Sequence, residues 1–150
     1  MILKVFTKAV IGFFLGVVAY VVLLVVWWQV YPYRTATIME PITVLNENKV
    51  VKKGEKLNLE FTFTKHTNVT PTVSRNIYCE NGAVYFPVVD TPITGAARPA
   101  GTFTVRSSYG LTTDMPLNTD CVFQFTNEYR VNPVRTITKV WKSENFTIVE

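Results

Sequence analysis

An uninterrupted apolar stretch, residues 9–28, constrains this chain more than any other feature of its sequence. It reads AVIGFFLGVVAYVVLLVVWW and contains no charged residue. Twenty residues in an α-helix rise roughly 30 Å, the thickness of the hydrocarbon core of a bilayer. Amphipathic rings, which favour the membrane–water interface, gather at its C-terminal end as Trp27, Trp28, Tyr31 and Tyr33. We therefore expect a single transmembrane helix over residues 9–30, which would hold the rest of the chain at a bilayer surface.

The charges on either side of this stretch predict its orientation. Lys4 and Lys8 precede it without any acidic residue, whereas Glu40 and Glu47 lie among the basic residues that follow. The positive-inside rule then leaves residues 1–8 in the cytoplasm and exports the C-terminal part to the periplasm or the extracellular space. A cleaved signal peptide has the same basic start, but its apolar core spans about 7 to 15 residues and ends in small residues. The longer stretch found here, followed by bulky WWQVYPYR, favours a retained anchor.

Two glycines inside the apolar stretch have the spacing of a helix-packing motif. Gly12 and Gly16 form a G-x-x-x-G pair in GFFLG. Small residues at this spacing let two helix backbones approach closely, so a homodimer through the transmembrane helix is one expectation. The alternative is that these glycines reflect only the general frequency of glycine in membrane helices.

The charge of the chain argues against nucleic acid as a partner. The formal net charge is +4, but from Tyr31 onward 13 Lys and Arg stand against 11 Asp and Glu, a net charge of +2. The basic residues of this part are dispersed and mixed with acidic ones, whereas nucleic-acid-binding domains gather them on one face. We expect the bilayer and another protein as partners, and no nucleic acid.

After a short linker at residues 31–37, the sequence changes to short β-type segments separated by turn residues. The clearest is 57–64, where Leu57, Leu59, Phe61 and Phe63 alternate with polar residues, the period of a strand with one buried face. An Asn81-Gly82 turn predicts a hairpin between two further segments. The expected strands are 42–45, 57–64, 73–79, 83–89, 102–107, one through 121–125, 135–141 and 146–149.

This spacing of strands predicts an all-β antiparallel sandwich over residues 38–150, preceded by the transmembrane α-helix. The order of segment lengths resembles the immunoglobulin-like superfold, with VVKKGEKLNLEFTF similar to a passage from strand A to strand B and SENFTIVE similar to a closing G strand. The resemblance rests on patterning over most of residues 38–150. It departs from antibody-type domains, which link strands B and F, because the expected strand B contains no cysteine.

The resemblance implies a position for each of the two cysteines. Cys79 would end strand C and Cys121 would lie near the start of strand F, two neighbouring antiparallel strands in such domains. A cross-strand disulfide between them is therefore expected, and an oxidising compartment favours it. Closing the loop between them would stabilise the domain by about 4 kcal/mol. A redox-active pair is the alternative, and the absence of a C-x-x-C motif argues against it.

Residues for catalysis or metal binding do not form any recognisable motif. His66 is the only histidine, so a His-rich metal site or a His-pair mechanism within one chain is excluded. Ser74 has no G-x-S-x-G context, the acidic residues are scattered singly, and Gly-rich phosphate loops are absent. We expect no enzyme, no metal and no cofactor.

Two hypotheses for the function follow. The first is a non-catalytic protein-binding or assembly module, displayed at the extracytoplasmic membrane surface. The alternative is a structural subunit of an envelope, virion membrane or secretion complex, in which the helix drives assembly. The arrangement of one helix and one β-domain resembles small single-pass bacterial or bacteriophage membrane proteins.

The longest irregular segment, 90–101, is the candidate binding loop, with Asp90, Ile93 and Arg98 as its candidate contact residues. Loops of this length are often functional, and a plain connector between strands is the alternative. If successive strands alternate in direction, loops 66–71, 90–101 and 127–133 face the membrane. Turns 52–55, 80–82 and 110–119 then lie at the far end with the C-terminus.

Overall fold

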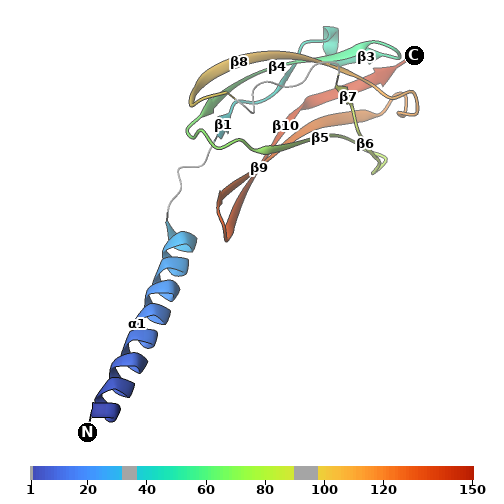
Figure 1. The fold of residues 1–150 in the computed structure, drawn as a ribbon. Coiled ribbons are helices and arrows are strands. Elements are labelled where there is room, and N and C mark those ends of the chain that lie inside the picture. The colour runs from blue at the N-terminus through green and yellow to red at the C-terminus, as the bar shows by residue number, and fades with distance from the viewer. Residues whose placement is uncertain (1, 32–36, 90–97) are drawn as a thin grey trace.

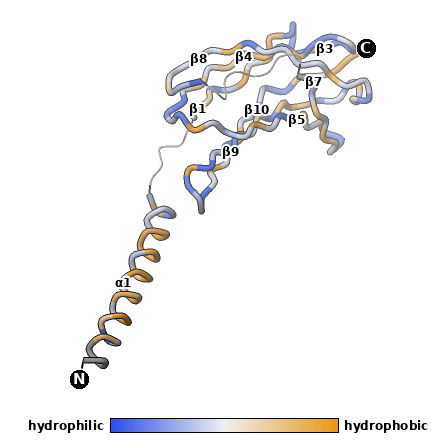
Figure 2. Tube along the Cα trace, in the orientation of Figure 1, coloured by the Kyte–Doolittle hydropathy of each residue, from blue (hydrophilic) through white to orange (hydrophobic). Residues whose placement is uncertain are grey.

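The computed structural model of the chain describes residues 2–31, 37–89 and 98–150. A single long helix, α1, runs over Ile2–Val30, and its segment Phe6–Val30 is long and apolar enough to cross a membrane (Figures 1 and 2). No part of the 18-residue window that meets this criterion is buried against the rest of the protein. The helix begins before the expected Ala9, because lysine is a good helix former and the two lysines near the N-terminus do not interrupt it.

The described remainder of the chain is mostly β-structure, arranged in two sheets (Figure 1). Its strands are β1 Thr37–Met39, β2 Thr43–Val44, β3 Val50–Lys52, β4 Lys56–Lys65, β5 Thr72–Cys79, β6 Val84–Tyr85, β7 Val88–Val89, β8 Gly101–Gly110, β9 Asp120–Asn132 and β10 Arg135–Val149. A short 3-10 helix, η1 Glu47–Lys49, lies between β2 and β3.

One sheet has the strand order β1-β4-β8-β7, and β2 also pairs with β4. All of these pairs are antiparallel. The alternation expected for 57–64 is confirmed: four side chains of β4 point into the core, each at most 7 % exposed, and they are Leu57, Leu59, Phe61 and Phe63.

The other sheet has the strand order β3-β10-β9-β5-β6. Strand β3 is parallel to β10, and the other pairs are antiparallel. The expected hairpin at Asn81-Gly82 is present, since β5 pairs with β6 around that turn. The segment before β4 therefore divides between the two sheets, with β1 and β2 in one and β3 in the other.

The core lies between the two sheets. Aromatic rings from opposite sheets meet there: the ring centroids of Phe61 and Phe125 are 5.9 Å apart, and those of Tyr109 and Phe123 are 4.7 Å apart. Full burial of such a side chain stabilises the fold by about 1.5–3 kcal/mol. This apolar layer joins the two sheets into one domain.

The prediction of a single strand over 83–89 is wrong. The chain forms β6 in one sheet and β7 in the other, with Phe86 and Pro87 between them. Proline has no N–H to donate to a ladder, so the strand ends before it and the chain crosses to the second sheet.

The loop expected at 127–133 and the two strands expected at 135–149 are also corrected. Strand β9 continues to Asn132 and β10 is one strand of 15 residues. The polar run that suggested a break in β10 is a bulge between Lys142 and Asn145. There the hydroxyl of buried Ser143 accepts a hydrogen bond from the backbone N–H of Phe123 at 3.0 Å, which replaces a ladder contact.

The registers of the strands define two ends of the domain. Thr37 lies opposite Lys65, which lies opposite Gly101, so loop 66–71 and the described residues 98–101 share the end nearer the helix. At the opposite end Lys52 pairs with Val149, next to the C-terminus (Figure 1). This is the division into near and far loops that the alternation of strand direction predicts. Which end faces a bilayer remains a prediction.

Candidate functional site: the junction of helix and β-domain

The hairpin of β9 and β10 extends toward the C-terminal end of α1 (Figure 1). Its two-residue turn is Pro133-Val134, and the backbone N–H of Val134 donates to Oδ1 of Asn132 at 3.0 Å. Further along β9, Tyr129 is 1 % exposed and its hydroxyl accepts a hydrogen bond from Nδ2 of Asn127 at 3.1 Å. A proline-initiated turn and this side-chain hydrogen bond explain why a segment with many polar residues is a strand.

Arg135 joins the hairpin to the end of the helix. Its Nη1 donates to the carbonyl oxygens of Gln29 at 2.8 Å and of Tyr31 at 2.9 Å. The last four carbonyls of a helix have no partner within the helix, and a cation is favoured at this negative end of the helix dipole. Arg135 therefore supplies both the donors and the charge that the end of α1 requires.

Two more hydrogen bonds complete the contact. Nδ2 of Asn132 donates to the carbonyl oxygen of Trp28 at 3.1 Å, and Nε2 of Gln29 donates to the carbonyl oxygen of Val134 at 3.2 Å. Donors thus come from both sides, and the hairpin is tied to Trp28, Gln29 and Tyr31 at the helix end. We call this set of contacts, from Trp28, Gln29 and Tyr31 to Asn132–Arg135, the helix clasp.

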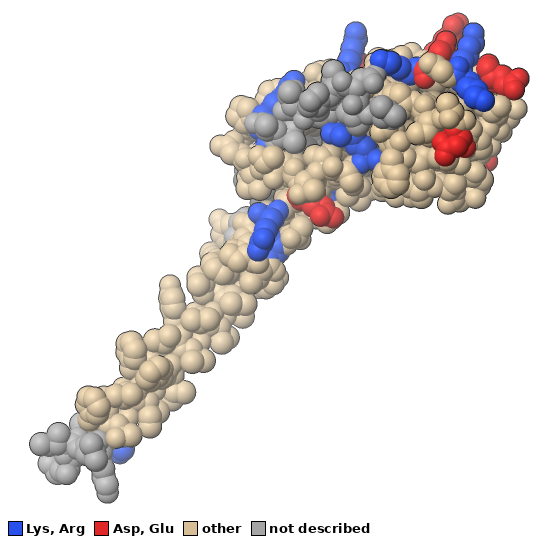
Figure 3. All heavy atoms as spheres, turned by 45° about the vertical axis from the view of Figure 1, so that its right-hand side comes forward, with Lys and Arg blue, Asp and Glu red and all other residues tan. Residues whose placement is uncertain are grey.

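The surface around the clasp combines aromatic and charged groups. The rings of Trp27 and Tyr31 are 5.1 Å apart, and the two residues are 60 % and 41 % exposed. Figure 3 shows basic and acidic side chains close to the end of the helix, while the visible face of the shaft is almost free of charge. This composition is typical of a protein segment at a membrane–water interface.

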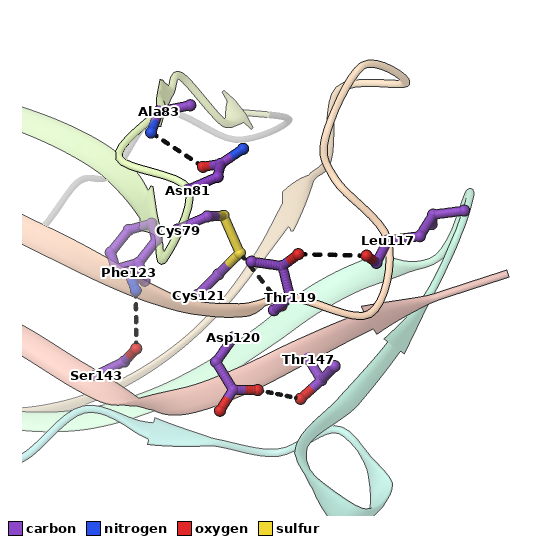
Figure 4. Close-up of a disulfide and its surroundings, with 10 residues drawn as sticks. All are labelled: Cys79, Asn81, Ala83, Leu117, Thr119, Asp120, Cys121, Phe123, Ser143 and Thr147. Atoms are coloured by element: carbon purple, nitrogen blue, oxygen red, sulfur yellow. Dashed lines mark hydrogen bonds between the residues drawn. A yellow bond between two sulfur atoms is a disulfide. The ribbon is translucent and has the colours of Figure 1, made fainter.

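The disulfide lies at the far end of the domain, because Asp120 beside Cys121 pairs with Thr147 near the end of β10. Figure 4 shows its surroundings. Cys79 and Cys121 are directly opposite each other on β5 and β9 and are bonded, as expected. Both are buried, and Thr147 donates a hydrogen bond to Asp120, beside Cys121, at 2.6 Å. A buried disulfide between two inner strands of a sheet is structural, because a redox-active pair must be accessible to its partner.

Of the three candidate residues in loop 90–101, Asp90 and Ile93 lie outside the described residues. Arg98 is held against the domain: its guanidinium carbon is 4.9 Å from the ring centroid of Phe103, and its carbonyl oxygen accepts a hydrogen bond from Nζ of Lys65 at 2.7 Å. Lys65 is 3 % exposed, and this burial lowers the pKa of its amine. The described end of the loop is therefore fixed to the β-domain by Arg98.

The glycine pair of α1 has open surroundings. A methyl group placed on Gly12 or Gly16 would meet no atom within 4 Å outside the local helix. The pair is thus available to a second helix. A structure of one chain does not test the homodimer, which stays a prediction.

An ion pair organises the far end. Nζ of Lys49 is 2.9 Å from Oε1 of Glu144, and the backbone N–H of Val44 donates to Oε2 of Glu144 at 3.3 Å. The hydrogen bond from Lys49 is the main reason that the pKa of Glu144 is lowered from 4.5. These contacts link η1 and β2 to the bulge of β10.

Apolar side chains are also exposed on the outer side of β5 and β6. Tyr78 and Val84 are register partners and are 38 % and 43 % exposed, and Phe86, two residues after Val84, is 71 % exposed. We call these three residues the β5–β6 patch. Exposed apolar groups that lie together mark interaction sites more often than single ones.

The structure places the one histidine of the sequence at the surface. His66 is exposed in its loop. Within the described ranges 2–31, 37–89 and 98–150, no three His, Cys, Asp or Glu residues form a group that could hold a metal ion. The site that the sequence did not reveal is the helix clasp. Its signal in the sequence is the turn N-P-V-R between two strands. The expected loop 127–133 contains Asn132 and Pro133, so the sequence does not predict the hairpin tip as such.

Comparison with known protein families and with curated proteins finds no match to this chain.

Proposed function

We propose that this chain is a single-pass membrane protein that holds a non-catalytic protein-binding or assembly module at the extracytoplasmic surface. Its N-terminus would be cytoplasmic and residues 38–150 would be periplasmic or extracellular. The observation that carries the proposal is the combination of an apolar helix, exposed along Phe6–Val30, with the clasp at its end. A helix with no protein cover needs lipid, and the clasp sets the position of the β-domain relative to it.

We also propose that the β-domain is an immunoglobulin-like sandwich. The strand order supports this: a sheet of β1 or β2 with β4, β8 and β7 corresponds to ABED, and a sheet of β10, β9 and β5 corresponds to GFC, with β6 added at its edge. The disulfide differs from that of antibody domains, because Cys79 and Cys121 join two neighbours of one sheet. Since such folds host many functions, the proposed role rests on the surface and the anchor.

Two surfaces are candidates for the protein partner. The β5–β6 patch offers Phe86, whose side chain the domain leaves 71 % exposed. Loop 90–101 remains a proposed contact, and because Arg98 is already engaged with Phe103, Asp90 and Ile93 would be its contact residues. A partner in the same membrane would meet this near loop.

Site-specific photo-crosslinking in the native membrane tests the binding role. A photoreactive amino acid replaces Phe86 in one variant and Ile93 in a second. The matched control replaces Leu45, an apolar residue that is 43 % exposed near the far end. A discrete crosslinked partner from Phe86 or Ile93, but not from Leu45, supports the proposal. Equal, diffuse crosslinking from all three positions in folded, inserted protein would contradict it.

The second candidate function is a structural subunit whose helix drives assembly, and the open surroundings of Gly12 and Gly16 favour it. Crosslinks from the lipid-facing helix alone would select this role. Replacement of Gly16 by Val should then abolish the assembly, whereas replacement of Val17 by Ile should not.

A further inference from the structure

The clasp fixes the position of the hairpin tip along the axis of the helix. If the helix is the membrane anchor proposed above, this position sets the depth of the tip in the membrane. If the hydrocarbon core begins after Lys8, about twenty helical residues carry the chain to Trp28 at its opposite boundary. Atoms of Asn132 and Arg135 lie 3.1 Å from the Trp28 carbonyl and 2.8 Å from the Gln29 carbonyl. The tip of the hairpin therefore lies at the level of the lipid headgroups.

The tip presents chemistry that fits this depth. Val134 is 43 % exposed at the turn, although its backbone N–H and carbonyl are both hydrogen-bonded. Arg130 is exposed on the outer side of β9, opposite Thr136 in the register, and makes a long hydrogen bond of 3.5 Å to the Pro133 carbonyl. An apolar side chain beside an arginine matches the boundary between acyl chains and phosphates.

We propose that the tip of the β9–β10 hairpin is a lipid contact site, in which Val134 enters the boundary of the acyl chains and Arg130 binds the phosphate of an anionic headgroup. Arginine suits this role because its planar guanidinium donates two parallel hydrogen bonds to a phosphate. The helix clasp and this lipid contact would act together, since the clasp holds the hairpin to the end of α1 and the lipid contact would hold its tip to the membrane surface.

A fluorescent label at the tip measures its depth. The full chain with Val134→Cys is labelled with an environment-sensitive fluorophore and reconstituted in vesicles of equimolar phosphatidylcholine and phosphatidylglycerol. The two native cysteines are bonded to each other, so the new thiol is the only one to react. Quenchers attached to lipid headgroups should quench this label several-fold more than the same label at Val140.

Val140 is a matched control because it lies on β10, the strand that begins directly after the tip, and is 49 % exposed. Six residues along a strand place it about 20 Å from the tip. Equal, weak quenching at both positions in inserted protein would overturn the proposal.

The role of Arg130 has its own test. In the labelled Val134→Cys chain, quenching should increase when phosphatidylglycerol replaces part of a pure phosphatidylcholine membrane. Arg130→Glu should remove this increase. Lys142→Glu makes the same change of charge at an exposed position of β10 farther from the tip, and it should preserve the increase. An increase that persists in Arg130→Glu would overturn the assignment of the phosphate to Arg130.

The same samples separate this inference from the proposed anchor. Acyl-chain quenchers should reduce the intrinsic fluorescence of Trp27 and Trp28 if the helix is inserted. Quenched tryptophans with an unquenched Val134 label would reject the lipid contact and leave the anchor intact. Unquenched tryptophans would reject the anchor itself.

Discussion

Reduction of the disulfide should lower the free energy of unfolding of the β-domain by an amount that depends on the length of the loop it closes. Cys79 and Cys121 are separated by 42 residues and close a loop that contains β6, β7 and β8. Cross-linking such a loop removes conformational entropy from the unfolded chain, and the chain-entropy relation gives about 4 kcal/mol at 25 °C. For a domain of this size the melting temperature should fall by roughly 15 °C on reduction.

Two comparisons separate the cross-link from the packing of the sulfurs. Chemical reduction keeps both side chains in place, whereas replacement of both cysteines by alanine also removes buried sulfur atoms, since Cys79 is 6 % exposed and Cys121 is 0 % exposed. The double variant should therefore be somewhat less stable than the reduced protein, because cavities add their own cost.

Urea unfolding of the full chain in detergent micelles gives the free energies. Near-ultraviolet circular dichroism is a suitable signal, because Trp141 packs against the core cluster. The control is the double alanine variant, whose unfolding should not change on addition of reductant. A difference in unfolding free energy below about 1 kcal/mol between oxidised and reduced protein would contradict an entropic role of this cross-link, because the entropy relation predicts several times more.

Two further predictions concern contacts at opposite ends of the domain. Arg135→Gln removes the cationic donor to the carbonyls of Gln29 and Tyr31. The distribution of distances between a spin label in the helix and one in a far turn should therefore become broader. An unchanged distribution would contradict the role of the clasp. At the far end, the pKa of Glu144 is depressed in the folded state from 4.5, so its contribution to stability is present above that value and is lost as the pH falls through the lowered pKa. In Glu144→Gln, the urea concentration at the midpoint of unfolding should depend less on pH in this acidic range, and removal of the Lys49 amine should have the same effect. If the midpoint of both variants falls with pH as steeply as that of the unmodified protein, the ion pair is not the source of this dependence.

The sequence predicts the elements whose pattern is governed by burial. The apolar stretch 9–28 and the alternation in 57–64 each have the period of the element they form, and the structure contains both. The resemblance to the immunoglobulin-like fold also implies the pairing of Cys79 with Cys121, and the structure contains this disulfide.

The sequence misses features that depend on polar groups satisfied from a distance. Asn132 favours a loop when it is considered locally, yet its side-chain amide donates to the Trp28 carbonyl at the helix end. Ser143 suggests a break, although its hydroxyl replaces a ladder partner in a bulge. These partners are up to 104 positions away along the chain, and no local pattern encodes them.

Protease protection of the full chain tests the membrane anchor most directly. The chain, with an epitope tag at its N-terminus, is expressed in bacterial cells, and spheroplasts are treated with external protease. We expect that the chain resists extraction with alkaline carbonate, that its N-terminus is retained, and that protease digests the β-domain while the tag remains protected. Release of the chain by carbonate, a mature N-terminus beyond Trp28, or digestion of the tag in intact spheroplasts would contradict the anchored, N-terminus-inside arrangement.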